Sequence, residues 1–109
     1  MYYTLNDTAT HGGVAAAAAI LGAKWAAEII YWLSSGARRF SQLEKHVVGI
    51  NPRTLSARLD ALEAAGIIVK KSRPRLPPRI EYVLTQKGKD LLPILQQMYQ
   101  WGSKYPRQV

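Results

Sequence analysis

Residues 51–65 read Asn-Pro-Arg-Thr-Leu-Ser-Ala-Arg-Leu-Asp-Ala-Leu-Glu-Ala-Ala and carry the strongest structural signal in the chain. Asn51 is a favoured N-cap and Pro52 a favoured first helical residue, so the segment predicts a helix that begins here. Three leucines recur at helical spacing and form one apolar face: Leu55, Leu59 and Leu62. Gly66 follows directly and is the expected helix stop.

The preceding segment predicts a shorter helix over residues 41–47. Ser41 can cap this helix, and Glu44, three residues later, completes the pattern of a capping box. Residues 48–50 then form a turn that contains a glycine. Two helices joined by such a turn, with Arg53 at the start of the second, are typical of a helix-turn-helix.

A β-hairpin is predicted after the second helix. Residues 67–69 are β-branched and short, and residues 79–84 alternate in the manner of a strand. The segment between them contains three prolines, which exclude a strand interior: Pro74, Pro77 and Pro78. The hairpin therefore has a basic, proline-stiffened loop, which is the addition that defines a winged helix-turn-helix.

The remaining segments complete a fold that is mainly α with a small β-hairpin (α+β). Residues 1–13 lack periodicity and end in a glycine pair, so they predict an N-terminal arm. Further helices are predicted at residues 14–21, at residues 24–33 and after Thr85, with Pro93 marking a kink or a break. Residues 14–105 then form one winged helix-turn-helix domain.

The distribution of charge points to an anionic partner. The chain has 15 Lys and Arg against 7 Asp and Glu, a net charge of +8. Residues 70–79 hold five basic residues and no acid. Because a solvated face normally mixes both signs, we expect this stretch to contact nucleic acid, an acidic membrane surface or an acidic protein.

Several classes of function are disfavoured. The chain has no cysteine, which excludes cysteine-based zinc sites and thiol redox chemistry within it. Catalytic motifs are missing too, so we expect no enzyme, metal or cofactor. The longest apolar run, residues 14–23, is far below the ~20 residues of a spanning helix, and no basic segment precedes it. We therefore expect a cytoplasmic, nucleoid-associated protein with no membrane contact.

Several motifs, in order along the chain, resemble the HxlR-type winged helix-turn-helix transcriptional regulators. They are residues 20–25 (ILGAKW), 39–43 (RFSQL), 49–59 (GINPRTLSARL), 77–85 (PPRIEYVLT), Leu91-Leu92-Pro93 and Trp101-Gly102. The resemblance covers about residues 14–102 and implies a homodimeric bacterial or archaeal DNA-binding regulator that dimerises through its terminal helices. Many members carry a redox-sensing cysteine just before the first helix, a place that falls near Gly12 in this chain. This chain lacks it, so the resemblance supplies no effector.

Candidate DNA-contacting residues follow from this arrangement. The N-terminal part of the second helix of a helix-turn-helix enters the major groove, where Arg53 can read guanine. Arginines on a narrow wing suit a minor groove or its phosphates. The full set of candidates is Arg38, Arg39, Ser41, Asn51, Arg53, Thr54, Ser56, Ala57, Arg58, Lys71, Arg73, Arg75 and Arg79.

Five of these residues have a structural alternative. Arg58 lies close to acidic residues in its own helix, and its flank can face the wing. Asn51 is better suited to capping than to touching DNA. Arg79 either contacts DNA or braces the wing, and Arg38 and Arg39 either grip a phosphate or brace the start of the helix-turn-helix.

The sequence thus predicts a sequence-specific transcription regulator that acts as a homodimer on double-stranded DNA. Its recognition helix, residues 51–65, occupies the major groove, and its basic wing, residues 70–79, contacts the minor groove or phosphates. One alternative is a sequence-tolerant architectural DNA-binding protein, and another is a winged-helix protein-interaction module. Aromatic residues on the Trp25 helix and the last helix raise the hypothesis that a small apolar or aromatic effector binds between them.

Overall fold

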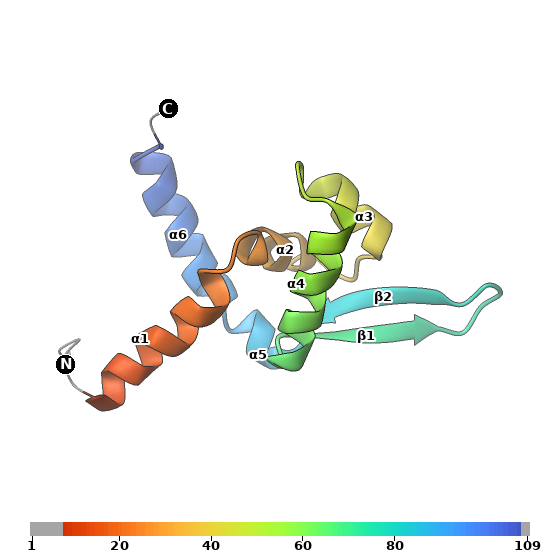
Figure 1. Cartoon of the computed structure of the whole chain (residues 1–109), viewed down its shortest axis with the longest axis horizontal. Coiled ribbons are helices and arrows are strands. Elements are labelled where there is room, and N and C mark those ends of the chain that lie inside the picture. The colour runs from red at the N-terminus through yellow and green to blue at the C-terminus, as the bar shows by residue number, and fades with distance from the viewer. Residues whose placement is uncertain (1–7, 108–109) are drawn as a thin grey trace.

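The computed structural model describes residues 8–107, and residues 1–7 and 108–109 lie outside the described part. Its elements are six helices and one two-stranded antiparallel hairpin, in the order α1, α2, α3, α4, β1, β2, α5 and α6. Figure 1 shows α2, α3 and α4 grouped at the centre, the hairpin extending to one side, and α1 and α6 projecting to the other. The fold is a winged helix-turn-helix, mainly α with a small β-hairpin, as predicted.

Helix α2 (Ala26–Leu33) lies at the centre of the core. Its residues Ile29 and Ile30 are completely buried, and α2 contacts α1, α3, β2 and α6. The core combines one apolar face from each neighbouring element: Ala26, Ile29, Ile30, Leu33, Leu43, Val47, Ile50, Leu55, Leu59, Leu62, Ile67, Ile68, Tyr82, Leu84, Leu91 and Leu95. The helix predicted over residues 24–33 includes Trp25, but in the structure Trp25 precedes α2, with φ at +77°.

Helix α4 (Pro52–Ala64) begins as the sequence predicts. The Asn51 side-chain oxygen accepts a hydrogen bond from the Thr54 backbone N–H at 2.8 Å, and Pro52 occupies the first turn. The three predicted leucines are buried on one face. Gly66 follows with φ at +77°, a conformation that favours glycine and ends the helix.

Helix α3 (Phe40–His46) begins differently from the prediction. The predicted cap by Ser41 with Glu44 is wrong, because Ser41 is the second residue of the helix and is exposed. Instead, the Gln42 side-chain oxygen accepts a hydrogen bond from the Arg39 backbone N–H at 2.8 Å. The backbone of Arg38 is held extended against Tyr82, so the helix starts immediately after Arg39.

Strands β1 (Ile68–Arg73) and β2 (Arg79–Leu84) pair from Ile68 opposite Leu84 to Arg73 opposite Arg79. Strand β1 extends beyond the predicted residues 67–69. Its outer half, residues 70–73, has no apolar pattern but pairs with β2 through backbone hydrogen bonds. Arg38 and Tyr82 exchange two backbone hydrogen bonds, of 3.1 and 2.7 Å. The base of the hairpin is thereby anchored to the core, whereas residues 74–78 form an exposed loop at its tip, which we call the wing loop.

The C-terminal helix is broken in two, α5 (Gln86–Lys89) and α6 (Leu92–Lys104). The first piece begins directly after Thr85, as predicted, and the Thr85 hydroxyl caps α5 by accepting a hydrogen bond from the Gly88 N–H at 3.1 Å. Pro93 lies in the first turn of α6, so it marks a break and not a kink. Gly88 is required here, because a Cβ at this position would lie 2.2 Å from the Ile67 carbonyl oxygen.

Helix α1 (Thr8–Leu21) begins before residue 14, so residues 8–13 of the predicted arm are helical. The other seven residues of that arm lie outside the described part. Among the described residues, no single helix is long and apolar enough to cross a membrane. Residues 12–21 and α2 reach the length and apolar composition of a membrane span only when taken together, and the two helices are bent by 81° relative to each other.

Candidate nucleic-acid interface

The exposed face of α4 carries the predicted recognition residues. Arg53, Ser56 and Ala57 are exposed, and Thr54 is half-buried with its backbone N–H held by Asn51. The buried leucines of α4 face the opposite way, into the core. The structure therefore places these side chains on the solvent side of the helix, as the helical spacing predicts.

Arg58, on the flank of α4, has a structural partner outside its own helix. Its Nε donates a hydrogen bond to the Lys24 carbonyl oxygen at 2.7 Å. Lys24 lies in the turn between α1 and α2, directly before Trp25. This contact gives Arg58 a structural role with a partner other than the acidic residues of α4 or the wing, since one of its donors ties α4 to the junction of the two preceding helices.

Arg38 is also engaged by the protein itself. Its backbone pairs with Tyr82, and its guanidinium donates to the Ala37 carbonyl at 3.2 Å and to the Ser35 hydroxyl at 2.8 Å. Its Nε is buried and has no hydrogen-bond partner within the described residues. Arg38 thus braces the connection between α2 and the hairpin.

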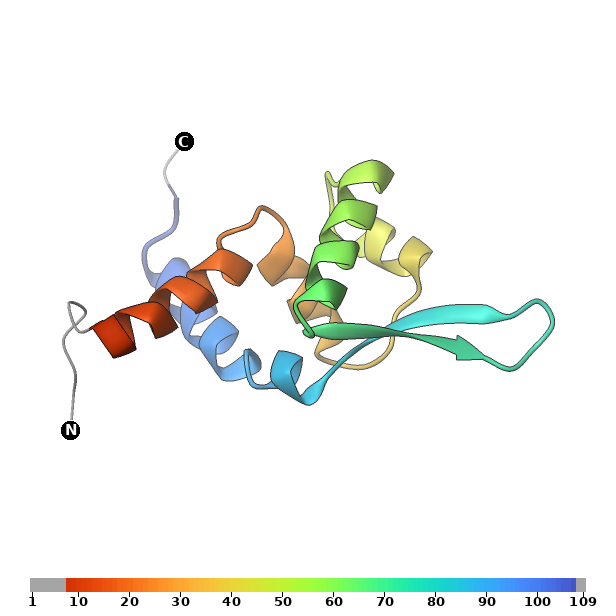
Figure 2. The same cartoon turned by 60° about the horizontal axis from the view of Figure 1, so that its bottom comes forward.

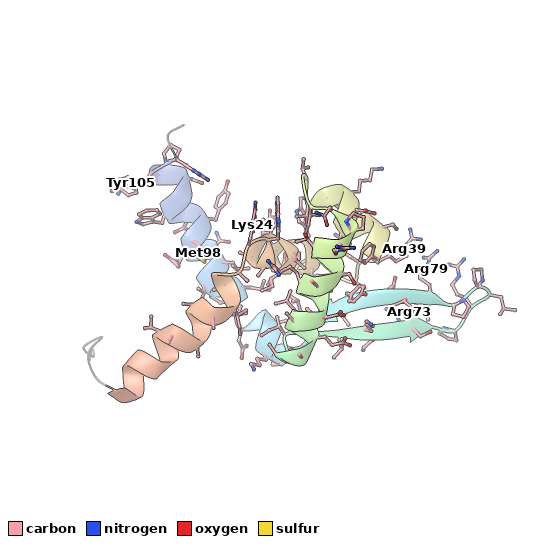
Figure 3. All side chains as sticks on the ribbon, viewed as in Figure 1. Lys24, Arg39, Arg73, Arg79, Met98 and Tyr105 are labelled. Carbon is pink, nitrogen blue, oxygen red and sulfur yellow. The ribbon has the colours of Figure 1, made fainter. Side chains whose placement is uncertain are left out.

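Three arginines from separate parts of the chain line one recess, which we call the arginine recess. Arg39 comes from the start of α3, Arg75 from the wing loop and Arg79 from β2; the hollow between them has a volume of about 280 Å³. Pro77, Pro78 and Ile80 complete its wall. Figure 3 shows Arg39 and Arg79 beside each other between α3 and the outer part of the hairpin. Three cations around one recess favour an anion within it.

Arg73, in contrast, is paired with an acid. Its Nε donates to the Glu81 carboxylate across the hairpin at 2.5 Å. This hydrogen bond with Arg73 lowers the pKa of the Glu81 carboxyl, and the positive charges of Arg79 and Arg39 act in the same direction. Lys71 lies directly opposite Glu81 in the strand register, on the face that also carries Arg73 and Arg79. Glu81 therefore offsets part of the basic charge of the wing.

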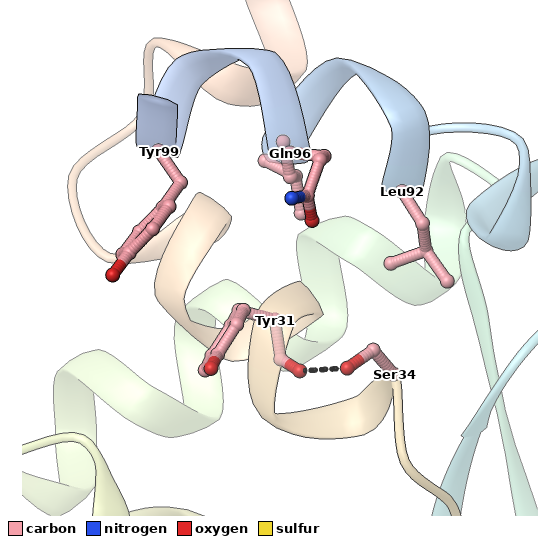
Figure 4. A pocket seen from close by; sticks show the side chains of 6 residues that line it. Tyr31, Ser34, Leu92, Gln96 and Tyr99 are labelled. Carbon is pink, nitrogen blue, oxygen red and sulfur yellow. Dashed lines mark hydrogen bonds between the residues drawn. The ribbon is translucent and has the colours of Figure 1, made fainter. Parts of the chain in front are cut away.

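A second hollow, of about 330 Å³, lies between α2 and α6. Its lining residues are Tyr31, Ser34, Leu92, Leu95, Gln96 and Tyr99. Figure 4 shows the rings of Tyr31 and Tyr99 on its wall and the Gln96 amide directed into it. The aromatic residues of these two helices raised the hypothesis of an effector between them, and this hollow lies at that place. Ser34 and Gln96 gave no sequence signal, because a polar residue on a helix or at its end is normally solvated.

The helix-turn-helix, its exposed recognition face and the basic hairpin define a winged helix-turn-helix DNA-binding protein. The chain belongs to the HxlR-like helix-turn-helix family, whose model matches residues 20–109. It is a transcriptional regulator of the helix-turn-helix type and not an enzyme. The resemblance expected from the sequence motifs is thereby confirmed.

Two curated relatives and one solved structure are similar over most of the chain. An HTH-type transcriptional regulator of Methanothermobacter thermautotrophicus is 39% identical over 85 residues, which are 78% of this chain and 65% of the relative. One from Halalkalibacterium halodurans is 42% identical over 86 residues, 78% of this chain and 76% of the relative. The oxidized form of the redox regulator HypR superposes with a TM-score of 0.81 at 34% identity, covering 89% of this chain and 99% of HypR. The present chain spans just under two thirds of the first relative.

Proposed function

We propose that this protein regulates transcription by binding a specific double-stranded DNA sequence as a homodimer in the cytoplasm. In this proposal, α4 enters the major groove and the wing, residues 70–79, lies on the minor groove and its phosphates. The observation that carries the proposal is the presence of an exposed Arg53–Ser56–Ala57 face on α4 together with the arginine recess of the wing. An arginine can read guanine through O6 and N7, while the recess suits a backbone phosphate.

The homodimer is supported by the large surface of the single chain. A compact monomer of 12.2 kDa exposes about 6,100 Å², whereas this chain exposes 8,047 Å². Its radius of gyration is 15.7 Å, against about 13 Å for a compact domain of this length. Helices α1 and α6 project from the core on the side away from the hairpin, as Figures 1 and 2 show.

Helix α6 carries the apolar surface that a partner would cover. Three of its large, exposed apolar side chains share one face at helical spacing: Ile94, Met98 and Trp101. Burying such a patch against its symmetric copy would stabilise a dimer. A two-fold dimer in turn requires a pseudo-palindromic operator with half-sites ~10 bp, or a multiple of that, apart.

Selection from a random pool of duplex DNA tests this function. The full chain is incubated with the pool at near-physiological salt, and the retained DNA is sequenced. Enrichment of a two-fold symmetric motif supports the proposal, and an Arg53→Ala variant should then lose its preference at one base pair of each half-site. Retention without enrichment favours the architectural alternative. No retention, even at low salt, contradicts DNA binding and favours an acidic protein partner.

The hollow between α2 and α6 favours a second role, the binding of a small neutral aromatic ligand. Two tyrosine rings offer stacking surfaces, and the Gln96 amide offers a donor and an acceptor. A panel of such compounds should therefore include some that raise the Tm of the protein. Gln96→Leu should reduce that rise while the Tm of the free protein stays close to that of the wild type. A panel without any stabilising compound contradicts this role.

A further inference from the structure

Leu76, at the tip of the wing, is an apolar side chain held in solvent. It is 95% exposed, which is the highest exposure of any large hydrophobic residue in the described part of the chain. It lies in the wing loop, the part of the hairpin farthest from the helical core (Figure 1). At the tip of the wing, the described residues of the chain therefore leave the Leu76 side chain unburied.

The wing loop presents Leu76 on a restricted backbone. Pro74 precedes it by two residues, and Pro77 and Pro78 follow it directly. Proline fixes its own φ near −65° and limits the preceding residue. Fewer conformations are then lost when the loop binds a partner. The prolines of the wing loop thus restrict the directions in which the Leu76 side chain can point.

The charge around Leu76 selects among the partners that could cover it. Arg75 and Arg79 line the arginine recess beside it, together with Arg39 from α3. A second copy of the wing would bring like charges together and is disfavoured. The partner must instead combine an anion for the recess with an apolar surface for the leucine. The minor groove of DNA has both, since phosphates line its edges and deoxyribose rings and base edges form its walls and floor.

We propose that Leu76 is a wedge that enters the minor groove and partly unstacks one base step, while the arginine recess holds an adjacent backbone phosphate. Apolar side chains inserted in this way kink the duplex toward the major groove by about 20–90°. The kink would bend the DNA toward α4 and bring more of the duplex against the protein. This inference rests on the proposed DNA binding and adds a residue that deforms the site.

If Leu76 acts as a wedge, the protein should prefer certain base steps under the wing. This preference would arise although no side chain forms a hydrogen bond to a base edge there. Pyrimidine–purine steps such as TA and CA/TG unstack most easily. Operators with such a step under the wing should therefore bind more tightly than operators with an A-tract there. The preference should depend on the side chain at position 76 and not on the recognition helix.

The test uses the full chain and the operator selected by the wild-type protein. End-labelled duplexes report the bend by energy transfer, and 2-aminopurine under the wing reports unstacking by increased fluorescence. Leu76→Ala should reduce both signals and lower the affinity about tenfold, as expected when a leucine loses its burial. The slope of log affinity against log salt should stay unchanged, because no charge is removed. Leu76→Met keeps an apolar wedge and should keep the bend.

Val48→Ala is the matched control, since Val48 is also apolar and 83% exposed but lies in the turn before α4. It should leave the bend and the 2-aminopurine signal unchanged. Wild-type binding to straight DNA, or an equal bend with Leu76→Ala, would overturn the wedge and leave the proposed function intact. Absence of any DNA binding by the wild type would instead refute the proposed function. A circular dichroism spectrum identical to that of the wild type confirms that each variant is folded.

Discussion

Arg58 on the recognition helix and Lys24 in the turn before α2 are 34 residues apart in sequence, yet the Nε of Arg58 donates to the Lys24 carbonyl at 2.7 Å. Lys24 follows α1, one of the two helices that project from the core. The bond therefore connects the element proposed to enter the major groove with the end of a helix proposed to meet the partner subunit. Arg58 can act on DNA binding through this connection without touching DNA.

Replacing Arg58 should separate its structural role from a contact with phosphate. Arg58→Ala is expected to lower the free energy of unfolding by about 0.5–1.5 kcal/mol, the usual net contribution of one hydrogen bond. Urea denaturation measures this change. The salt dependence of DNA binding should stay unchanged, whereas Arg75→Ala should reduce its slope by about one. A reduced slope with Arg58→Ala would show that Arg58 binds phosphate after all.

Asn51 should stabilise α4 through its side-chain cap. Asn51→Ala removes the acceptor for the Thr54 N–H and is expected to cost about 1 kcal/mol of unfolding free energy. Asn51→Asp keeps an acceptor at the same place and should retain most of the stability. Chemical denaturation of the three proteins compares them directly. Equal stability of the alanine variant and the wild type would contradict a capping role.

Glu81 should weaken DNA binding, because it neutralises Arg73. Glu81→Gln removes the carboxylate charge, so we expect tighter binding and a steeper salt dependence. Glu28→Gln, an exposed change on α2 that is far from the hairpin in sequence, controls for net charge. Fluorescence anisotropy at several salt concentrations measures both variants. Equal effects of the two substitutions would mean that only net charge matters.

The Arg73–Glu81 pair also gives stability a defined pH dependence. Hydrogen bonding to Arg73 lowers the pKa of Glu81 from its usual value of 4.5. The carboxylate therefore contributes its full stabilisation above pH 4.5, and this contribution is lost as the pH falls through the lowered pKa of the folded state. Glu81→Gln should flatten this part of the stability profile. A wild-type profile identical to that of the variant would contradict the assignment.

The apolar face of α6 should control assembly. Trp101→Glu places a charge among its exposed apolar side chains and is expected to yield monomers in sedimentation experiments. Gln100→Glu adds the same charge at the neighbouring exposed position and should leave the dimer intact. The Tm of the wild type should rise with protein concentration, because association stabilises the folded state. A monomeric wild type would exclude the dimer.

The sequence predicts those features that depend on neighbouring residues. The Asn51 cap, the three leucines of α4 and the stop at Gly66 all act within one or two helical turns, so their spacing is sufficient to identify them. The start of α3 was not predictable, because it combines the hydrogen bond from the Arg39 N–H to the Gln42 side chain with pairing between Arg38 and Tyr82, which lie 44 positions apart. Similarly, the arginine recess is lined by residues from the start of α3 and from the wing, and no local sequence pattern predicts that these residues lie together.

The role of Arg38 shows the same limit. A pair of arginines before a helix-turn-helix is compatible with phosphate binding at both positions. The structure assigns different surroundings to the two, since Arg38 is bonded within its own loop while Arg39 faces the wing arginines. Only the tertiary arrangement distinguishes them, because the two residues are identical in type and adjacent in sequence.

The segment that links β2 to α6 is held in place by contacts with the backbone of residues 66 and 67. Thr85 donates to the carbonyls of Gly66 and Ile67, and Gly88 approaches Ile67 so closely that no side chain fits between them. The direction in which the chain leaves the hairpin toward α6 is therefore set by backbone contacts beside α5 and not by the side chains of α6. An insertion of flexible residues after Gly88 would release α6 from this direction.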